Sequence, residues 1–291
     1  MSTQPKQPKQ PKQPKPFVKW VGWVGGKRSI INELFINELL QRIPKQINNY
    51  YEPFVGGGAL FFKIYNMVNH SYLSDLNADL VVSYNIIKNE PQKLIELLNK
   101  HKKNHIEEYY YKIRAMHELQ DPIEKAARFI YLMQTCFNGL YRVNKKNEFN
   151  TSIGSYKKPN ICNKENIFAV NQALQHATIK CQDFTKITPQ KGDFVYFDPP
   201  YYPTSNDSFT KDIINLVLNN GFNEKDQTRL KDFALELTKA GINIMISNSD
   251  AEFIIDLYKK NFNINIVSAP RVINCKADKR QPVYETLITN F

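Results

Sequence analysis

The chain of 291 residues is 42% hydrophobic and 12% aromatic, which is enough apolar material for one large domain or for a core domain with a smaller one attached. It has no run of about 18 apolar residues and no apolar segment near its N-terminus, so neither a membrane span nor a secretory signal is expected. The net charge of +11 indicates a polyanionic partner, most often a nucleic acid.

The four cysteines lie far apart, and no two form a C-x-x-C pair. This spacing is not typical of a structural zinc site or of a disulfide framework. We therefore expect no metal, four reduced thiols and an intracellular protein.

Residues 4–15 repeat the tripeptide Gln-Pro-Lys, as "QPKQPKQPKQPK". Proline at every third position favours a polyproline II helix, which would place the lysines along one edge. We expect residues 1–16 to be a disordered tail. Two interpretations stay open: an arm on DNA phosphates, or a solubilising leader.

Hydrophobic periodicity predicts the elements of the first half of the chain. We expect a helix over 29–43, then a strand, a glycine turn and a helix over 49–68. A second strand ends near Asp75 and is followed by a helix to 89, and residues 90–135 are mainly helical. The strand, turn, helix and strand order is typical of a βαβ unit.

Two strand-like runs, 140–144 and 148–152, flank Lys145-Lys146-Asn147 and predict a basic β-hairpin. A polar loop is expected over 203–221. The remaining predictions are strands at 177–184, 192–201 and 242–250, helices at 223–241 and 252–262, and closing strands at 265–275 and 284–291.

The turn "EPFVGGG", residues 52–58, follows the first of these strands. Glycines at such a place allow a tight turn and the close approach of a ligand, while Asp75 at the end of the next strand could accept hydrogen bonds from ribose hydroxyls. Glu52 stands where a phosphate carrier would need a lysine, and no P-loop motif occurs, so a sulfonium nucleoside is favoured. The alternative is a tight turn that binds nothing.

The sequence "FVYFDPPY", residues 194–201, ends an apolar strand in Asp198, two prolines and Tyr201. The prolines make a stiff corner at the end of a strand, where α/β sheets bind ligands. The Asp198 carboxylate and the Pro199 carbonyl could accept hydrogen bonds from an exocyclic amino group, and Tyr201 could stack on its base. The alternative is a strand-ending turn within a core sheet.

An adenine amino group inside duplex DNA is hidden, so the base would have to be flipped out at a cost of a few kcal/mol. Phosphate contacts and a wedge would have to supply that energy. The basic hairpin is the candidate for both.

Motifs in a shared order carry a family resemblance: "EPFVGGGALFF", "SDLNADL", "FNGLYRVN…EFN", "DPPY" and "ISNSD". The chain resembles the Dam-type (α-class) DNA adenine-N6 methyltransferases, which use S-adenosylmethionine, from about residue 17 to 291. The resemblance implies a Rossmann-like α/β methyltransferase sheet with helices on both faces. It also implies a catalytic domain of 17–86 and 177–291, and a mainly helical target-recognition region with a β-hairpin, 87–176.

The family's N-terminal motif has Lys-Trp, one small residue and Gly-Gly-Lys, whereas this chain has "KWVGWVGGK", with Trp-Val-Gly duplicated. Trp23 stands at the family's distance from Gly-Gly-Lys, so the resemblance assigns the cofactor-binding roles to Trp23 and Lys27. Lys19, which would face DNA, is displaced by three residues. Either it still reaches DNA through a bulged loop or that contact is lost, and the duplication could equally only lengthen a surface loop.

The remaining roles are implied by the resemblance, motif by motif. The cofactor-binding residues would be Glu52, Phe54, Gly56, Asp75, Asp183, Phe184 and Asp198, and the catalytic residues Asp198, Pro199, Pro200 and Tyr201. The DNA-binding residues would be Lys19, Phe137, Asn138, Leu140, Arg142 and Lys157. Arg142 is the expected base-contacting residue because arginine bonds bidentately to guanine.

The resemblance implies methylation of adenine N6 in duplex DNA at GATC, although Ser152 and Ser155 replace a proline and an arginine that many GATC-specific relatives have. A cytosine-N4 methyltransferase, a non-catalytic DNA-binding relative and an RNA methyltransferase remain alternatives. A partnered restriction endonuclease is possible, and the protein is expected to act with DNA in the cytoplasm or nucleoid, or at a viral replication site.

Overall fold

The computed structural model describes residues 30–203, 222–269 and 283–291. Seven strands form one sheet in the order β3-β2-β1-β4-β5-β7-β6. Their bounds are β1 Asn49–Glu52, β2 His70–Asp75, β3 Ala177–Cys181, β4 Phe194–Phe197, β5 Asn243–Ser249, β6 Asn263–Ala269 and β7 Val283–Thr289.

The first five strands are parallel to their neighbours, with β1 between β2 and β4. Only β7 runs antiparallel, paired with both β5 and β6. Because the strand order reverses at β1 and β4, a crevice is expected at the carboxyl ends of these strands. This mixed sheet confirms the predicted Rossmann-like methyltransferase class.

Side chains alternate along β4 between two hydrophobic clusters, one on each face of the sheet. Phe194 and Tyr196 join the cluster that includes side chains of the helices α1 and α3. Val195 and Phe197 join the cluster that includes side chains of α9 and α10. Helices therefore cover both faces, as predicted.

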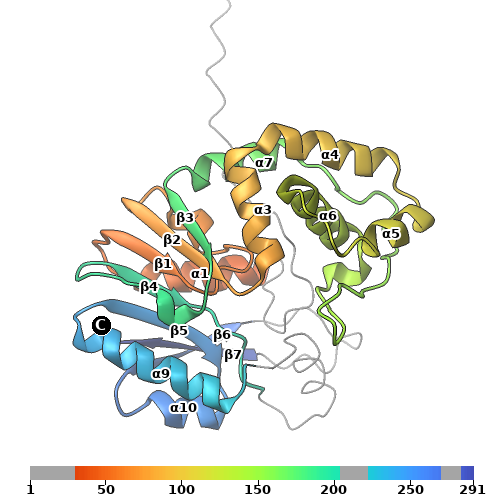
Figure 1. The fold of residues 1–291 in the computed structure, drawn as a ribbon. Coiled ribbons are helices and arrows are strands. Elements are labelled where there is room, and N and C mark those ends of the chain that lie inside the picture. Colours follow the sequence, from red (N-terminus) through yellow and green to blue (C-terminus); the bar gives the residue numbers. More distant parts are fainter. Residues whose placement is uncertain (1–29, 204–221, 270–282) are drawn as a thin grey trace, which may run out of the picture.

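The helices are α1 Ile30–Arg42, α2 Phe61–Ile64, α3 Ala78–Asn89, α4 Pro91–Lys103, α5 Glu107–Arg114, α6 Pro122–Thr135, α7 Lys164–Leu174, α9 Glu224–Lys239 and α10 Glu252–Tyr258. Figure 1 shows α4, α5 and α6 gathered to one side of the sheet, next to α3. Helix α6 packs on α3, α4 and α5, and so connects this helical group to the sheet. None of the helices in the described ranges is long and apolar enough to cross a membrane.

Helix α9 begins where the sequence predicts. The Asn223 side chain accepts from the backbone N–H groups of Lys225 and Asp226, and the Asp226 carboxylate accepts from the Asn223 N–H, which completes a capping box. Gly241, just past the end of the helix, adopts a φ of 75°, which glycine tolerates without strain.

Three local expectations differ from the structure. Helix α2 spans only four residues. Turns and bends occupy residues 65–68, where the helix was predicted to continue. Helix α7 lies in the region predicted to be mainly helical, although no separate helix was predicted at these residues. The hairpin lacks regular strands: it has isolated bridges at Val143–Phe149 and Cys136–Ile153. Backbone hydrogen bonds such as Asn144 N–H to the Glu148 carbonyl cross it, and the side chains of Arg142 and Thr151 add bonds to backbone carbonyls. The polar loop expected at 203–221 lies outside the described residues except for Pro203.

Candidate active site

Four predicted carboxylates lie at one edge of the sheet. Glu52 ends β1 and Asp75 ends β2, while Asp198 follows β4 directly and Asp183 follows β3 after one residue. Because these strands are parallel and adjacent, their carboxyl ends meet at the same edge. The fold therefore brings together residues that are up to 146 positions apart in the sequence, as expected for a ligand site of an α/β sheet.

The glycine turn after β1 is held by Asp75. The Gly56 N–H donates to Asp75 Oδ2 at 3.0 Å, and the Asn77 N–H donates to Asp75 Oδ1 at 2.9 Å. On the other side of the turn, the Tyr84 hydroxyl donates to the Gly56 carbonyl at 2.9 Å. Gly56 itself has a φ of 45°, and a Cβ placed there would meet nothing closer than 3.9 Å. The turn thus has an open backbone position that a ligand can approach.

Burial raises the pKa of Asp75, and hydrogen bonds from the backbone N–H groups of Asn77, Gly56 and Leu76 offset this only in part. A carboxylate can accept about four hydrogen bonds, so these three leave acceptor capacity for a further donor. Asp75 is therefore able both to hold the glycine turn and to accept a hydroxyl group of a ligand.

Glu52 is a buried acid, with 2% of its surface exposed. The Tyr50 hydroxyl donates to Glu52 Oε2 at 2.9 Å. Burial, followed by the charge of Glu52, raises the pKa of Tyr50 far above its ordinary value, so this tyrosine stays a donor. A carboxylate held in this way at a strand end suits a cationic ligand group.

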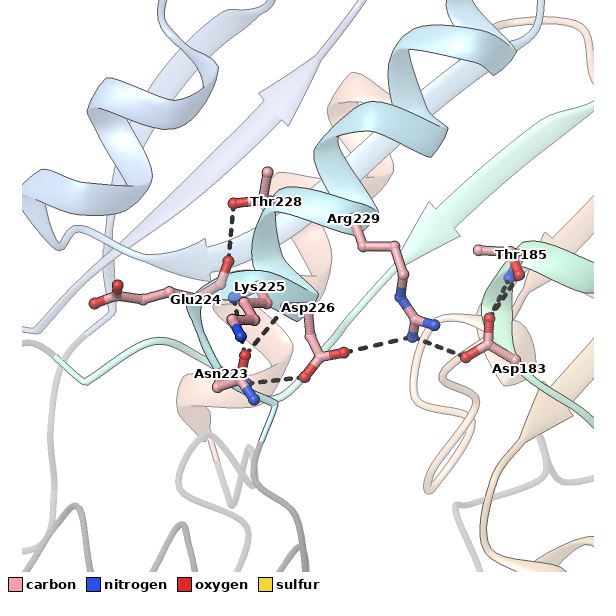
Figure 2. Close-up of polar contacts among 8 residues, drawn as sticks. All are labelled: Asp183, Thr185, Asn223, Glu224, Lys225, Asp226, Thr228 and Arg229. Carbon is pink, nitrogen blue, oxygen red and sulfur yellow. Dashed lines mark hydrogen bonds and ion pairs between the residues drawn. The ribbon is translucent and has the colours of Figure 1, made fainter.

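Asp183 and Phe184 are covered by a residue that the sequence did not single out. Arg229 of α9 donates from Nη2 to Asp183 Oδ2 at 2.9 Å, and its guanidinium carbon lies 4.6 Å from the Phe184 ring centroid. Asp183 Oδ1 accepts from the N–H and the hydroxyl of Thr185. Figure 2 shows this chain of contacts, which continues from Arg229 to Asp226 at 3.5 Å.

Partial burial raises the pKa of Asp183, but the hydrogen bonds from Thr185 and the charge of Arg229 outweigh it, and the pKa is lower than usual. Phe54, from the glycine turn, stacks on Phe184 with centroids 5.4 Å apart. Phe54, which follows β1, and Phe184, which follows β3, are both predicted to bind the cofactor, and they contact each other directly.

The Asp198–Tyr202 segment, here called the corner, follows β4. Pro199 is buried, and Tyr201 donates its hydroxyl to Glu285 Oε2 of β7 at 2.9 Å. Burial, followed by the charges of Asp198 and Glu285, raises the pKa of Tyr201 well above its ordinary value. Tyr201 therefore keeps its proton, and its hydroxyl fixes the direction of the ring.

The predicted DNA-binding residues gather around the hairpin. Phe137 is 51% exposed, and Asn138 beside it is exposed with a φ of 53°, a conformation that asparagine tolerates better than most residues. Arg142 donates from Nε to Asn150 Oδ1 at 2.8 Å and from Nη2 to the Asn150 carbonyl at 3.3 Å. Leu140 is half-buried and Lys157 is exposed.

Tyr141 connects the hairpin to the sheet edge. Its side chain hydrogen-bonds with Asn77, whose N–H donates to Asp75. Burial raises the pKa of Tyr141 to about 12, so it is a neutral hydroxyl at pH 7. The residues expected to bind DNA and those expected to bind the cofactor therefore lie next to each other. Lys19, Trp23 and Lys27 lie outside the described residues.

Several polar residues around the site had no assigned role in the sequence-based prediction: Arg229 and Gln227 of α9, Asn248 and Ser249 of β5, and Glu285 of β7. Asn248 and Ser249 lie in the "ISNSD" motif, so their place at a strand end was a usable signal. Arg229 and Gln227 lie on an ordinary amphipathic helix, where no local pattern distinguishes them.

Comparisons with known proteins identify the family of the chain. The family model "D12 class N6 adenine-specific DNA methyltransferase" matches residues 23–273. The chain is 39% identical over 259 residues to the type II methyltransferase M1.LlaDCHI of Lactococcus lactis subsp. cremoris, covering 86% of this chain and 88% of that protein. It is 40% identical over 285 residues to the type II methyltransferase M.MjaIII of Methanocaldococcus jannaschii, covering 91% of this chain and 96% of that protein.

The DNA adenine methylase of Escherichia coli (strain K12) is 30% identical over 258 residues, covering 87% of this chain and 89% of that protein. Among solved structures, the magnesium protoporphyrin IX methyltransferase of Synechocystis PCC 6803 is 11% identical, with a TM-score of 0.36 over 92% of this chain and 86% of that chain. The family assignment rests on the sequence relatives and the family model. The chain belongs to the D12 class of S-adenosylmethionine-dependent, N6 adenine-specific DNA methyltransferases.

Proposed function

We propose that this enzyme methylates N6 of an adenine that is flipped out of duplex DNA, within the sequence GATC. The observation that carries the proposal is the position of the corner, whose Asp198 follows β4 at the same sheet edge as Glu52 and Asp75. A methyl donor and an amino acceptor bound at this edge would meet at Asp198.

For the cofactor, we assign Glu52, Phe54 and Gly56 of the glycine turn, together with Asp75. The acceptor capacity of Asp75 supports hydrogen bonds from ribose hydroxyls. We assign Asp183 and Phe184 to the adenine end of the cofactor, and Trp23 and Lys27 to the same pocket from their sequence motif. S-adenosylmethionine supplies the methyl group on a positively charged sulfur, an electrophile that needs no metal.

In the reaction, the Asp198 carboxylate and the Pro199 carbonyl accept the hydrogens of the adenine amino group. This holds the nitrogen lone pair away from the ring system and toward the methyl carbon. With the methyl donor held by Glu52, Phe54, Gly56 and Asp75, the N6–C bond would form as the C–S bond broke. S-adenosylhomocysteine would be the leaving group, and the proton lost from N6 would pass to solvent. Tyr201 stacks on the base, and its direction is supported by the 2.9 Å hydrogen bond to Glu285.

For DNA, we assign residues 87–176 as the target-recognition region, beside a catalytic domain of 17–86 and 177–291. Phe137 would enter the duplex as a wedge, since half of its surface is exposed on a short turn. Asn138 and Leu140 would contact the space that the flipped base leaves, and Arg142 would contact a guanine. Lys157 and Lys19, with the 1–16 tail, would contact phosphates.

We further propose that the protein acts where DNA is present and, as the names of two relatives suggest, beside a cognate restriction endonuclease. Genomic co-occurrence with an endonuclease that cuts the same sequence would support this. Protection of DNA from that endonuclease by prior methylation is the expected result.

Two duplexes that differ only by GATC versus GTTC test the target. The protein is mixed with each duplex and methyl-labelled S-adenosylmethionine, and the methylated nucleoside is identified after digestion. We expect N6-methyladenine from the GATC duplex alone. Label in both duplexes would contradict GATC specificity and direct attention to Ser152 and Ser155, which replace residues of GATC-specific relatives.

A further inference from the structure

The two prolines stiffen the backbone of the corner but limit the hydrogen bonds that it can donate. Pro199 and Pro200 have no backbone N–H, so two of its residues can donate no hydrogen bond to a neighbouring strand. Hydrogen bonds from side chains on other elements can therefore add to the position that the prolines set. The described residues place such groups on α9, β5 and β7.

A buried amide pair provides the first support. Gln227 of α9 donates from Nε2 to the Pro200 carbonyl at 3.0 Å, and Asn248 of β5 donates from Nδ2 to Gln227 Oε1 at 3.0 Å. Both side chains are fully buried, with 0% exposure. A buried amide that loses one partner incurs the desolvation cost of that group, so the pair resists rearrangement.

Asn248 and Ser249 bind the next residue of the corner, Tyr202. The Tyr202 N–H donates to Asn248 Oδ1 at 3.0 Å, and the Ser249 hydroxyl donates to the Tyr202 carbonyl at 2.6 Å. The Ser249 N–H also donates to Asn248 Oδ1, at 2.8 Å. Because backbone N–H groups only donate, Asn248 must present its oxygen to them and its nitrogen to Gln227, and the network has a single orientation.

Glu285 of the neighbouring strand β7 provides a further support. It accepts the hydroxyl of Tyr201, and the register of β5 and β7 places it opposite Ser249. The corner is therefore held at Pro200, Tyr201 and Tyr202 by three elements that are separate in the sequence.

We propose that Gln227, Asn248 and Glu285 are positioning residues for methyl transfer. The amide pair sets the place of the corner's backbone, and Glu285 sets the direction of the Tyr201 ring. In this proposal the three residues act through the corner and do not touch the reacting atoms. This inference rests on the proposed function of the corner, and it assigns roles to residues that act only through Pro200, Tyr201 and Tyr202.

The first test is Gln227→Met, which keeps the volume of the side chain and removes both of its hydrogen bonds. The matched control is Leu237→Ala, a truncation of a buried core residue on the same helix that does not touch the corner. Single-turnover methyl transfer, S-adenosylmethionine affinity and thermal stability are measured for both. The DNA is whichever duplex the wild-type protein methylates.

We expect Gln227→Met to lower the single-turnover rate by about 10-fold to 100-fold, as small misplacements of reacting groups do. The affinity for S-adenosylmethionine should stay close to that of the wild type. Leu237→Ala should lose stability but keep the rate. With 2-aminopurine in place of the target adenine, Gln227→Met should also change the fluorescence of the flipped base, which stacking on Tyr201 would quench. Equal rates in the two variants would overturn the proposal.

A second test does not depend on Gln227→Met folding. Tyr201→Phe keeps the ring and removes its hydroxyl, and Glu285→Leu removes the acceptor. If Glu285 acts through Tyr201, the double variant slows methyl transfer by less than the product of the two single effects, and Glu285→Gln restores most of the rate lost in Glu285→Leu. Effects that multiply would overturn the role of Glu285. A wild-type protein that methylates no duplex would contradict the proposed function instead.

Discussion

Arg229 and Asp183, 46 residues apart in the sequence, form an ion pair at the sheet edge, with Arg229 Nη2 2.9 Å from Asp183 Oδ2. The same guanidinium lies over Phe184. Arg229 therefore covers the two residues that we assign to the adenine of the cofactor. It also lines an open cavity of about 670 Å³ beside α9, together with the acidic residues Glu224, Asp232 and Glu236.

Arg229→Ala should tighten the binding of S-adenosylmethionine by a few fold, because it uncovers the Asp183 carboxylate and one side of Phe184. Asp183→Ala should weaken binding, because a lost hydrogen bond to a charged group is worth about 1.5–3 kcal/mol. Titration calorimetry measures both. Lys225→Ala is the matched control, since Lys225 lines the same cavity but has no contact with Asp183. Weaker binding by Arg229→Ala would show instead that the arginine belongs to the cofactor site.

The affinity for S-adenosylmethionine should decrease as the pH decreases, because Asp75 becomes protonated. Its pKa is raised above the ordinary 3.8, so the folded protein binds a proton in a window that begins near 3.8 and extends upward. Within that window, proton binding by Asp75 stabilises the folded cofactor-free protein. This stabilisation is present at the lower pH values and is lost as the pH rises through the raised pKa. Ribose hydroxyls donate to the ionised form, so affinity should drop as the pH falls through the same window.

The measurement is the dissociation constant of S-adenosylmethionine across this pH range, for the wild type and for Asp75→Asn. The variant should bind more weakly at pH 7 and should show a flatter pH dependence. An unchanged slope in Asp75→Asn would assign the titration to another group.

Gly56→Ala and Gly241→Ala separate backbone strain from cofactor contact. Both positions have a positive φ, 45° and 75°, and both have room for a methyl group, with the nearest atoms 3.9 Å away. Each substitution should therefore lower the free energy of unfolding by about 1–2 kcal/mol. Only Gly56→Ala should also weaken S-adenosylmethionine binding. Equal affinities in the two variants would contradict a role of the glycine turn in the site.

Arg142 and Lys145 should differ in how they affect DNA binding. Arg142 is held by Asn150 before DNA arrives, so we expect a directed contact to a guanine, and Arg142→Ala should cost about 1–3 kcal/mol and relax selection at one base pair. Lys145 is exposed at the hairpin tip, and Lys145→Ala should weaken binding to all sequences alike and reduce its salt dependence. Competition binding with duplexes altered at each position compares the two. Uniform weakening by Arg142→Ala would exclude it as the base-contacting residue.

Much of the sheet could be predicted because its signals are local. The strand that ends in Asp75, the cap at Asn223 and the apolar run before Asp198 each depend on a few adjacent residues. The hairpin pairs at the predicted residues but forms only isolated bridges, and the Thr151 hydroxyl and the Arg142 guanidinium add bonds to backbone carbonyls. The β-propensity of residues predicts regular strand pairing better than it predicts such side-chain hydrogen bonds.

The supports of the site could not be predicted because they depend on distant pairs. Gln227 meets Pro200, and Glu285 meets Tyr201, only after the sheet has formed. The proposed catalytic motif could be found from its unusual residues, whereas the residues that hydrogen-bond to it are of ordinary types. Their roles follow from burial and hydrogen-bond partners alone.

The most direct test of the central claim is the identity of the methylated nucleoside made by the wild type and by Asp198→Ala. Each protein is incubated with methyl-labelled S-adenosylmethionine and duplex DNA, and the digested product is separated. We expect N6-methyladenine from the wild type and no methylated base from Asp198→Ala, although the variant still binds S-adenosylmethionine. N4-methylcytosine from the wild type, or N6-methyladenine from Asp198→Ala at an undiminished rate, would contradict the account.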